Sequence, residues 1–218
     1  IDSDDKRRVL KSINKEIPTA LLGSEVSKYK NSIMTPSDVK SQAQGKLYSE
    51  IADIYEKYEE HLLKNNLVDF DDLLLLPYKI LKNNQKLAES TSQKYQYIMV
   101  DEYQDTNELQ YRLLRLLCSN HDNLCVVGDD DQSIYGWRGA TIKNILNFNE
   151  HFKRATIVKL EENYRSTDTI LHHANALIEH NRDRLGKKLV GTKDKGSSIK
   201  VYESHDENEE TRKNSVSC

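Results

Sequence analysis

Tyr97-Ile98-Met99-Val100-Asp101-Glu102 is a short apolar run that ends in two acids, and it indicates the fold class. A second run, residues 124–127, is followed by Gly-Asp, and a third occupies residues 156–160. Helical periodicity lies between the runs, at residues 109–117 and around 142–146. Short apolar strands that alternate with helices predict an α/β protein with a parallel sheet. Ligands on such sheets bind beyond the carboxyl ends of the strands, so we expect chemistry in the polar residues there.

The part of the chain before this pattern, residues 1–92, is predicted to be helical. Apolar residues recur at helical spacing over residues 2–17. The Thr-Pro-Ser-Asp sequence at residues 35–38 is a helix-start signal, with proline near the first turn. Residues 46–64 carry one apolar stripe with charged residues on the other side, and residues 69–81 give a further helix. The stripe consists of Leu47, Ile51, Ile54, Tyr55, Tyr58 and Leu62.

The two acids at the end of the first run suit phosphoryl transfer. One carboxylate, Asp101, would hold Mg²⁺ through its water shell, and the next, Glu102, would accept a proton from an attacking water. A buried strand would fix both to a rigid platform. The alternative is an acidic turn that only caps the following helix, which is common at strand ends.

Residues 128–140, GDDDQSIYGWRGA, gather three acids, an amide, two aromatics and an arginine in one loop after the second run. The only tryptophan of the chain, Trp137, lies there among polar residues and glycines. Aromatic faces beside a cation suit stacking on unpaired bases. Gln132 could reach a phosphate or the attacking water. The alternative is that Tyr135 and Trp137 pack against neighbouring helices.

Three blocks together resemble consecutive motifs of the UvrD/PcrA/Rep family of superfamily 1 DNA helicases. They are DEYQDTN at residues 101–107, GDDDQSIYGWRGA at 128–140 and LEENYRST at 160–167, in the order of the family. DFDDL at residues 69–73 resembles a further family signature. The resemblance implies part of the parallel sheet of a RecA-like P-loop NTPase, with an inserted all-helical subdomain.

The resemblance also assigns roles around the nucleotide, with ATP as the substrate and Mg²⁺ as the cofactor. It implies that Asp101 helps to hold Mg²⁺ and that Glu102 is the catalytic base. It implies that Gln132 senses the γ-phosphate and links hydrolysis to DNA. Tyr164 would stack on adenine, and Arg165 would contact the γ-phosphate as an arginine finger. Guanidinium donors and a tyrosine ring are suited to these tasks.

For DNA, the resemblance implies that Tyr135 and Trp137 stack on single-stranded bases. Arg138 would either contact DNA or brace the loop through the acids at residues 129–131, and both readings stay open. The implied partners are single-stranded DNA and junctions of single- and double-stranded DNA. The implied activity is 3′→5′ movement on single-stranded DNA with strand separation, driven by ATP.

The phosphate-binding loop of such a motor, Gly-x₄-Gly-Lys-Ser/Thr, has no counterpart in the sequence. GTKDKGSS at residues 191–198 has the glycine spacing but a serine in place of the lysine, and it is interpreted as a turn. We therefore expect a piece of a longer helicase that is inactive alone. Its expected parts are a helical inserted subdomain at residues 1–92, the latter part of the first RecA-like domain at 93–160, and the start of the second at 161–218.

Two other functions are compatible with the same sequence. One is a DNA-binding or protein-interaction module, with the helical part gripping duplex. The other is a piece of a RecB/AddA-like helicase–nuclease, whose nuclease motifs would lie outside these residues. The QSIYGWRGA form at residues 132–140 favours the UvrD/PcrA/Rep branch.

The C-terminal part carries weaker patterns. Residues 166–180 predict a capped helix and residues 199–202 a fourth strand. Residues 203–218 are polar and charged without a core-forming pattern, so we expect them to be frayed. The chain starts at Ile1 without a methionine or a targeting pattern, which suits an excised piece.

Composition limits the classes of protein further. The formal net charge is −3, so DNA contacts must come from local groups and not from a uniformly basic surface. Cys118, Cys125 and Cys218 fit no metal-ligand spacing and are predicted to be free thiols of a cytoplasmic protein. No apolar run approaches the roughly 20 residues that span a bilayer, so no membrane association is expected.

Overall fold

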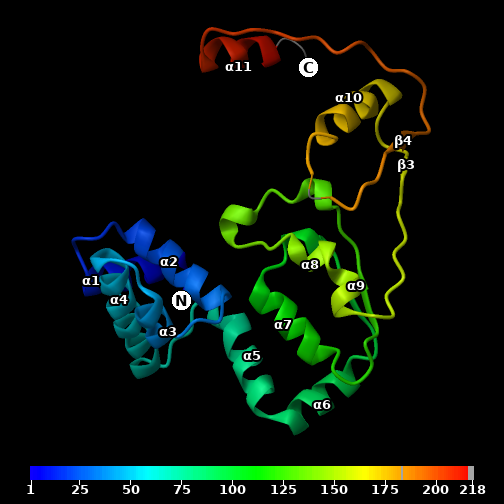
Figure 1. Ribbon diagram of the computed structural model, residues 1–218. Coiled ribbons are helices and arrows are strands. Elements are labelled where there is room, and N and C mark those ends of the chain that lie inside the picture. Colours follow the sequence, from blue (N-terminus) through cyan, green and yellow to red (C-terminus); the bar gives the residue numbers. More distant parts are fainter. Residues whose placement is uncertain (183, 216–218) are drawn as a thin grey trace. The chain divides into compact units, whose positions relative to one another are not determined.

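The computed structural model describes residues 1–182 and 184–215, and the chain forms two compact units, Ile1–Ala155 and Thr156–Cys218 (Figure 1). The first unit begins with six helices: α1 (Ser3–Ile13), α2 (Thr19–Asn31), α3 (Pro36–Gln42), α4 (Lys46–Lys64), α5 (Asp72–Asn83) and α6 (Gln85–Lys94). It continues with β1 (Ile98–Val100), the 3₁₀ turn η1 (Tyr103–Asp105), α7 (Glu108–Leu117), β2 (Leu124–Val126), the 3₁₀ turns η2 (Asp130–Gln132) and η3 (Gly136–Arg138), α8 (Lys143–Leu146) and α9 (Phe148–His151). The predicted helical character of the first 92 residues is therefore confirmed.

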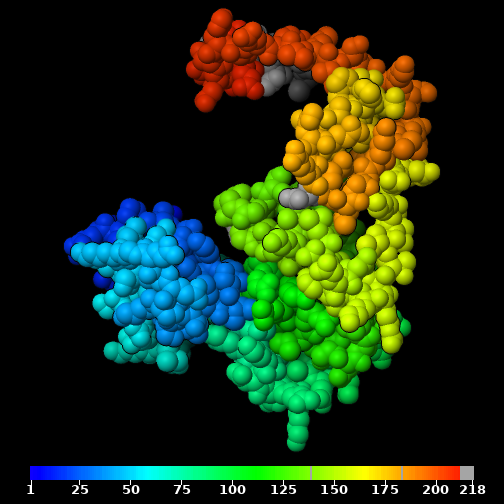
Figure 2. Space-filling model, in the orientation of Figure 1, coloured from blue at the N-terminus to red at the C-terminus, as the bar shows by residue number. Residues whose placement is uncertain are grey.

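Helices α1–α4 pack around a shared apolar core and form one continuous mass in the space-filling view, drawn from blue to cyan (Figure 2). The predicted stripe on α4 supplies much of this core, except that Leu47 at the first turn is 44% exposed. Burial of this stripe is the main force that holds a helix of this length in place. The buried members of the core are Leu10, Ile17, Leu22, Val26, Tyr29, Val39, Ile51, Ala52, Ile54, Tyr55, Tyr58 and Leu62.

Helices α3 and α7 start with reciprocal side-chain caps. The predicted start of α3 is confirmed: the Asp38 N–H donates to Thr35 Oγ1 (3.2 Å), and the Thr35 N–H donates to Asp38 Oδ2 (2.8 Å). At α7 the N–H groups of Gln110 and Asn107 each donate to the other residue's side-chain oxygen, both at 2.9 Å. These bonds satisfy amide groups that have no partner within the helix.

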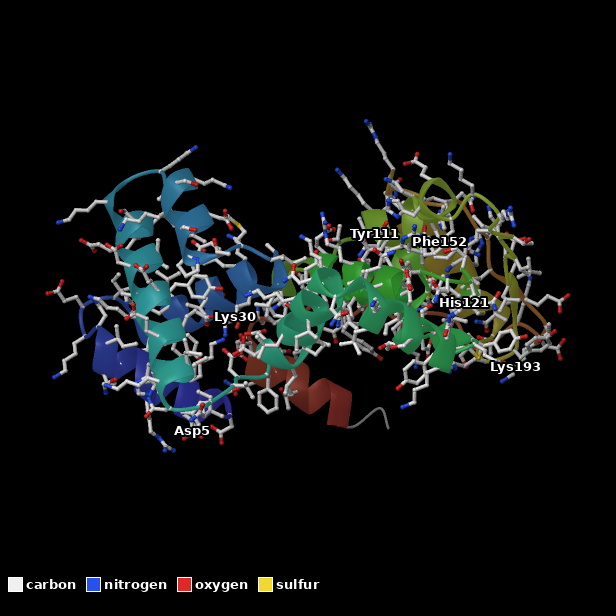
Figure 3. All side chains as sticks on the ribbon, turned by 90° about the horizontal axis from the view of Figure 1, so that it is seen from below. Asp5, Lys30, Tyr111, His121, Phe152 and Lys193 are labelled. Atoms are coloured by element: carbon white, nitrogen blue, oxygen red, sulfur yellow. The ribbon has the colours of Figure 1, made fainter. Side chains whose placement is uncertain are left out.

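A buried lysine joins α2 and α4 to the acidic segment that opens α5. Lys30 is fully buried among the blue-to-cyan helices (labelled in Figure 3), and its Nζ lies 2.8 Å from Glu59 Oε1, 3.1 Å from Asp69 Oδ2 and 2.8 Å from Asp72 Oδ1. Tyr58 donates to Asp69 Oδ2 at 2.9 Å. Burial alone would lower the pKa of Lys30, but the surrounding carboxylates outweigh it and the pKa is raised. The lysine therefore stays charged at the centre of this cluster.

A second set of polar contacts extends this connection to α7. Asp71 Oδ2 accepts from Lys6 Nζ (2.8 Å) and Ser27 Oγ (2.7 Å), and Asp71 Oδ1 accepts from Asn31 Nδ2 (2.9 Å). Asn31 Oδ1 in turn accepts from the Nδ2 of Asn107, the cap residue of α7 (2.8 Å). The acidic segment thus ties the first helices to the helix that follows β1.

Parallel pairing of the first two apolar runs is confirmed. β1 and β2 pair in parallel, with Ile98 opposite Leu124 and Val100 opposite Val126. The predicted strand at residues 156–160 is wrong, because this segment has no partner strand among the described residues and exposes side chains such as Val158 and Leu160. Strand structure needs a hydrogen-bonded neighbour as well as an apolar sequence.

The second unit contains β3 (Glu162–Asn163), α10 (Asp168–Ile178), β4 (Val190–Gly191) and α11 (Glu207–Ser215). β3 and β4 pair in parallel. The predicted strand at residues 199–202 is not formed, and the expectation of a frayed end is wrong for residues 207–215, which are helical. Asp206 Oδ1 accepts the Glu209 N–H at 2.7 Å, and acidic residues in the first turn favour a helix start.

Two further expectations concern thiols and membranes. Cys118 and Cys125 are both free, as predicted, and burial raises the pKa of the Cys118 thiol to about 11. Cys218 lies outside the described residues. Among the described residues, no helix combines the length and apolar character needed to cross a bilayer.

The buried cluster around Lys30 generates a prediction about stability. Lys30→Met would leave the carboxylates around it buried without their central cation, and we expect a loss of about 3–5 kcal/mol in the free energy of unfolding. Lys28→Met on the same helix, where the lysine side chain is 63% exposed, should change it by less than about 0.5 kcal/mol. Urea denaturation followed by circular dichroism measures both, and equal midpoints for the two variants would contradict the role of the cluster.

Candidate functional site

The two acids after β1 lie on a sharp turn at the carboxyl end of the strand. Asp101 and Glu102 are both exposed, and the Glu102 N–H donates to Asp101 Oδ1 at 2.9 Å. Glu102 has a left-handed backbone, with φ 50° and ψ 43°, a conformation that is uncommon for residues other than glycine. Asn107 caps α7, so the alternative in which these acids cap that helix is wrong. Both carboxylates are available for chemistry.

Gln104, which the sequence did not single out, connects the two strand ends. Its side chain is only 1% exposed. The amide nitrogen donates to Glu102 Oε2 at 2.7 Å, and the amide oxygen accepts the Asp129 N–H at 3.0 Å. The position of Gln104 two residues after Glu102 was visible in the sequence, but its burial between two loops was not.

The loop after β2 is organised by the side chain of Asp129. Its Oδ1 accepts the Asp131 N–H at 3.0 Å and its Oδ2 accepts from Gln132 Nε2 at 2.7 Å. Asp129, Asp130 and Asp131 each offer a carboxylate oxygen within 4.8 Å of the others. The bonds give a continuous path from Glu102 through Gln104 and Asp129 to Gln132. The structure therefore brings together the predicted base and the predicted γ-phosphate sensor.

Gly128 permits this close approach of the two loops. A Cβ at this position would lie 2.7 Å from Gln104 Oε1, 2.9 Å from Ile145 Cδ1 and 3.1 Å from the Tyr103 nitrogen. The Tyr103 N–H also donates to the Val127 carbonyl at 3.0 Å. Any larger side chain would push the second loop away from η1.

The aromatic part of the loop presents its tryptophan to solvent. Trp137 is 76% exposed and does not belong to the core of the described residues, whereas Tyr135 is 39% exposed. Tyr135 lines a hollow of about 320 Å³ together with Asp105, Asn107, Gln110 and Ala140. The loop is tied back to η1 because the Thr141 N–H donates to the Thr106 carbonyl at 2.9 Å. The side chain of Arg138 lies outside the described part of the chain.

Tyr164 and Arg165 lie in the second unit, on the turn after β3. Tyr164 is 67% exposed, and its hydroxyl donates to the Glu162 carboxylate, which raises the pKa of Tyr164. Asn163 Oδ1 accepts the N–H groups of Arg165 (3.0 Å) and Ser166 (2.8 Å). The Lys193 ammonium donates to the Arg165 carbonyl at 2.9 Å. The backbone of the predicted nucleotide contacts is thus fixed while both side chains remain exposed.

Residues 191–198 form no phosphate-binding loop. A phosphate-binding loop leads directly into a helix, whereas in the described residues that follow β4 no helix begins before Glu207. Gly196 packs against Thr167, so closely that a Cβ would collide with its side chain. Residues 192–193 form a bend and residues 194–198 have no regular secondary structure, so the predicted turn is not formed as such.

The donor set at the end of β1 fits a hard divalent cation. Mg²⁺ prefers oxygen ligands and usually keeps several waters while it binds one or two carboxylates. The exposed carboxylate of Asp101, with that of Glu102 beside it, offers such oxygens at a strand end. These residues are therefore compatible with a magnesium ion held mainly through water.

Nearly the whole chain matches two domain families. Residues 2–153 match the UvrD/REP helicase N-terminal domain, and residues 158–216 match the UvrD-like helicase C-terminal domain. The chain belongs to the UvrD/Rep helicase family.

Among curated proteins, the chain is similar to enzymes named ATP-dependent DNA helicase PcrA. The protein from Staphylococcus epidermidis (strain RP62A) is 41% identical over 96% of this chain, and that from Staphylococcus aureus (strain Mu50) is 42% identical over the same share. The chain spans about 30% of the length of these relatives.

The contact at Gly128 gives a prediction with an internal control. Gly128→Ala should lower the free energy of unfolding by about 1–3 kcal/mol, because the added methyl group overpacks the site between Gln104 and Ile145. Gly136→Ala should have little effect, since nothing lies within 4 Å of a Cβ there. Thermal melting of both variants tests this, and a Gly128→Ala protein that melts like the wild type would show that the loops do not approach this closely.

Proposed function

We propose that the full-length protein that contains this chain is an ATP-dependent DNA helicase that moves 3′→5′ on single-stranded DNA and separates strands. The observation that carries the proposal is the path of hydrogen bonds from Glu102 to Gln132. Gln132 stands at the start of the loop that exposes Trp137. One short segment thus connects a candidate hydrolysis site with a candidate base-stacking surface.

On the nucleotide side, Asp101 would help to hold Mg²⁺, and Glu102 would take the proton of the attacking water. Bound Mg²⁺ would neutralise charge on the phosphate oxygens during transfer. The exposure of both carboxylates at a strand end supports this assignment. Gln132, whose amide is oriented by Asp129 Oδ2 at 2.7 Å, would sense the γ-phosphate.

In the second unit, Tyr164 and Arg165 would bind nucleotide. A tyrosine ring offers a face for adenine, and a guanidinium offers several donors to a γ-phosphate. Their exposure on a backbone that Asn163 holds in place supports these roles.

The exposed side chains of the first sheet favour the proposal that it is part of a larger RecA-like sheet in the full-length protein. β1 and β2 are apolar, yet Met99 is 78% exposed and Val127 at the end of β2 is 52% exposed. Parallel sheets are normally covered on both faces, and two strands alone are rarely stable. Further strands and helices, including a phosphate-binding loop, would complete the motor. Residues 1–92 would be the inserted helical subdomain, residues 93–160 the end of the first motor domain and residues 161–218 the start of the second.

On the DNA side, Tyr135 and Trp137 would stack on unpaired bases, and Arg138 would contact DNA or brace the loop. The net charge of −3 favours such local contacts over a basic surface. The substrates would be single-stranded DNA and its junctions with duplex, in the cytoplasm.

Removal of the proposed base should separate nucleotide binding from hydrolysis. In the full-length protein, Glu102→Gln should keep nucleotide affinity while DNA-stimulated ATP hydrolysis falls by about 10²- to 10⁴-fold, the usual range for a general base. Glu108→Gln, at a residue that pairs with Arg112 at 2.6 Å on α7, is the matched control and should hydrolyse normally. Residues 1–218 alone serve as the blank, since they lack the phosphate cradle. Normal hydrolysis by Glu102→Gln would show that the base is another residue.

Loss of the exposed tryptophan should weaken DNA binding without loosening the fold. Trp137→Ala in the full-length protein should weaken single-strand binding by about 1–3 kcal/mol, the range for one base–aromatic stack. Tyr97→Ala removes an aromatic ring that is similarly exposed, at 79%, and should leave binding unchanged. Fluorescence anisotropy and thermal melting are measured together. A large drop in melting temperature with unchanged affinity would contradict the stacking role.

A further inference from the structure

The amide of Gln104 is oriented by two partners of different kinds. The Asp129 N–H can only donate, so it fixes the amide oxygen on its own side at 3.0 Å. The amide nitrogen must then face Glu102, and it donates to Oε2 of that carboxylate at 2.7 Å. A carboxamide carries an acceptor oxygen and a donor nitrogen, so it can accept from one loop and donate to the other at the same time. The orientation follows from chemistry and does not depend on a choice between amide rotamers.

The surroundings of Gln104 leave it little freedom to move. Gln104 is 1% exposed, and its amide oxygen lies so close to Gly128 that a methyl group on the Gly128 Cα would not fit between them. The backbone carbonyl oxygen of Gln104 lies 3.5 Å from Ser133 Oγ in the loop after β2. Glu102, in contrast, is exposed and sits on a left-handed turn. An exposed glutamate samples several rotamers, and fixing one of them costs conformational entropy.

We infer that Gln104 is a positioning residue that holds the Glu102 carboxylate in one orientation and makes this orientation depend on the loop after β2. The backbone N–H of Asp129 donates to the amide oxygen of Gln104, and the side-chain carboxylate of Asp129 accepts from the amide nitrogen of Gln132. A movement of Gln132 toward a phosphate would therefore act, through Asp129, on the Gln104 amide that orients the Glu102 carboxylate. Gln104 is buried and would act only through Glu102. The inference rests on the proposed function, in which Glu102 is the base.

The consequence is a selective effect on the chemical step. A misplaced base lowers the rate of proton removal, while the groups that bind the nucleotide remain in place. Loss of Gln104 should therefore lower kcat for ATP hydrolysis and leave KM for ATP nearly unchanged. General damage to the fold would instead lower the active fraction and the melting temperature together.

The test uses Gln104→Met in the full-length protein, because methionine keeps the volume and removes both hydrogen bonds. We expect kcat to fall by about 10- to 100-fold, with KM changed by less than about threefold. Gln85→Met is the matched control: Gln85 donates its amide to Glu89 Oε1 at 2.8 Å on the exposed face of α6, and its loss should leave kcat unchanged. If Gln104→Met does not fold, Gln104→Asn decides, because its shorter amide cannot span both partners. Wild-type kcat in the folded variant overturns the inference.

A double-mutant cycle shows whether Gln104 acts through Glu102. In a Glu102→Gln background, adding Gln104→Met should change the residual single-turnover rate by less than about twofold. If the fold-loss in rate of the double variant equals the product of the two single fold-losses, Gln104 acts independently of Glu102, and the inference is overturned. A wild-type protein without DNA-stimulated hydrolysis overturns the proposed function and the inference with it. Normal wild-type hydrolysis with an unaffected Gln104→Met variant overturns the inference alone.

Discussion

The parallel pairing of β1 with β2 is the constraint on which the candidate site depends. Val100 lies opposite Val126, so both strands end at the same level and release their loops at one edge. Two bonds continue the pairing past the strands: Val127 N–H to the Val100 carbonyl at 2.8 Å, and Tyr103 N–H to the Val127 carbonyl at 3.0 Å. Without this register, the acids after β1 and the amide after β2 would not share one network.

The acidic segment at residues 69–72 has a structural explanation that differs from that of the acids after β1. Asp69 and Asp72 are buried against Lys30, whereas Asp101 and Glu102 are exposed. The ammonium of Lys30 also draws the pKa of Asp69 below its ordinary value, although burial opposes the shift and Lys6 contributes more. Carboxylates of the same chemical type thus serve the fold in one place and remain available for chemistry in another.

The sheet and the buried amide together connect the two loops through few residues. Gly128 lets the loops approach, Gln104 joins them, and Asp129 passes the connection to Gln132. Along this path Gln104 is buried, and Asp129 contributes both its backbone N–H and its side-chain carboxylate.

Local patterns in the sequence were enough to predict α4 from Lys46 to Lys64 and the start of α3 at Thr35, because helical periodicity and caps involve residues within a few positions of one another. The motif blocks at residues 101–107 and 128–140 likewise identified the family without coordinates. Only the tertiary structure decided that residues 156–160 are not a strand and that residues 207–215 are a helix. It alone placed Gln104 between two loops 25 residues apart. Strand pairing and burial depend on residues that are distant along the chain, and a local sequence pattern does not identify those residues.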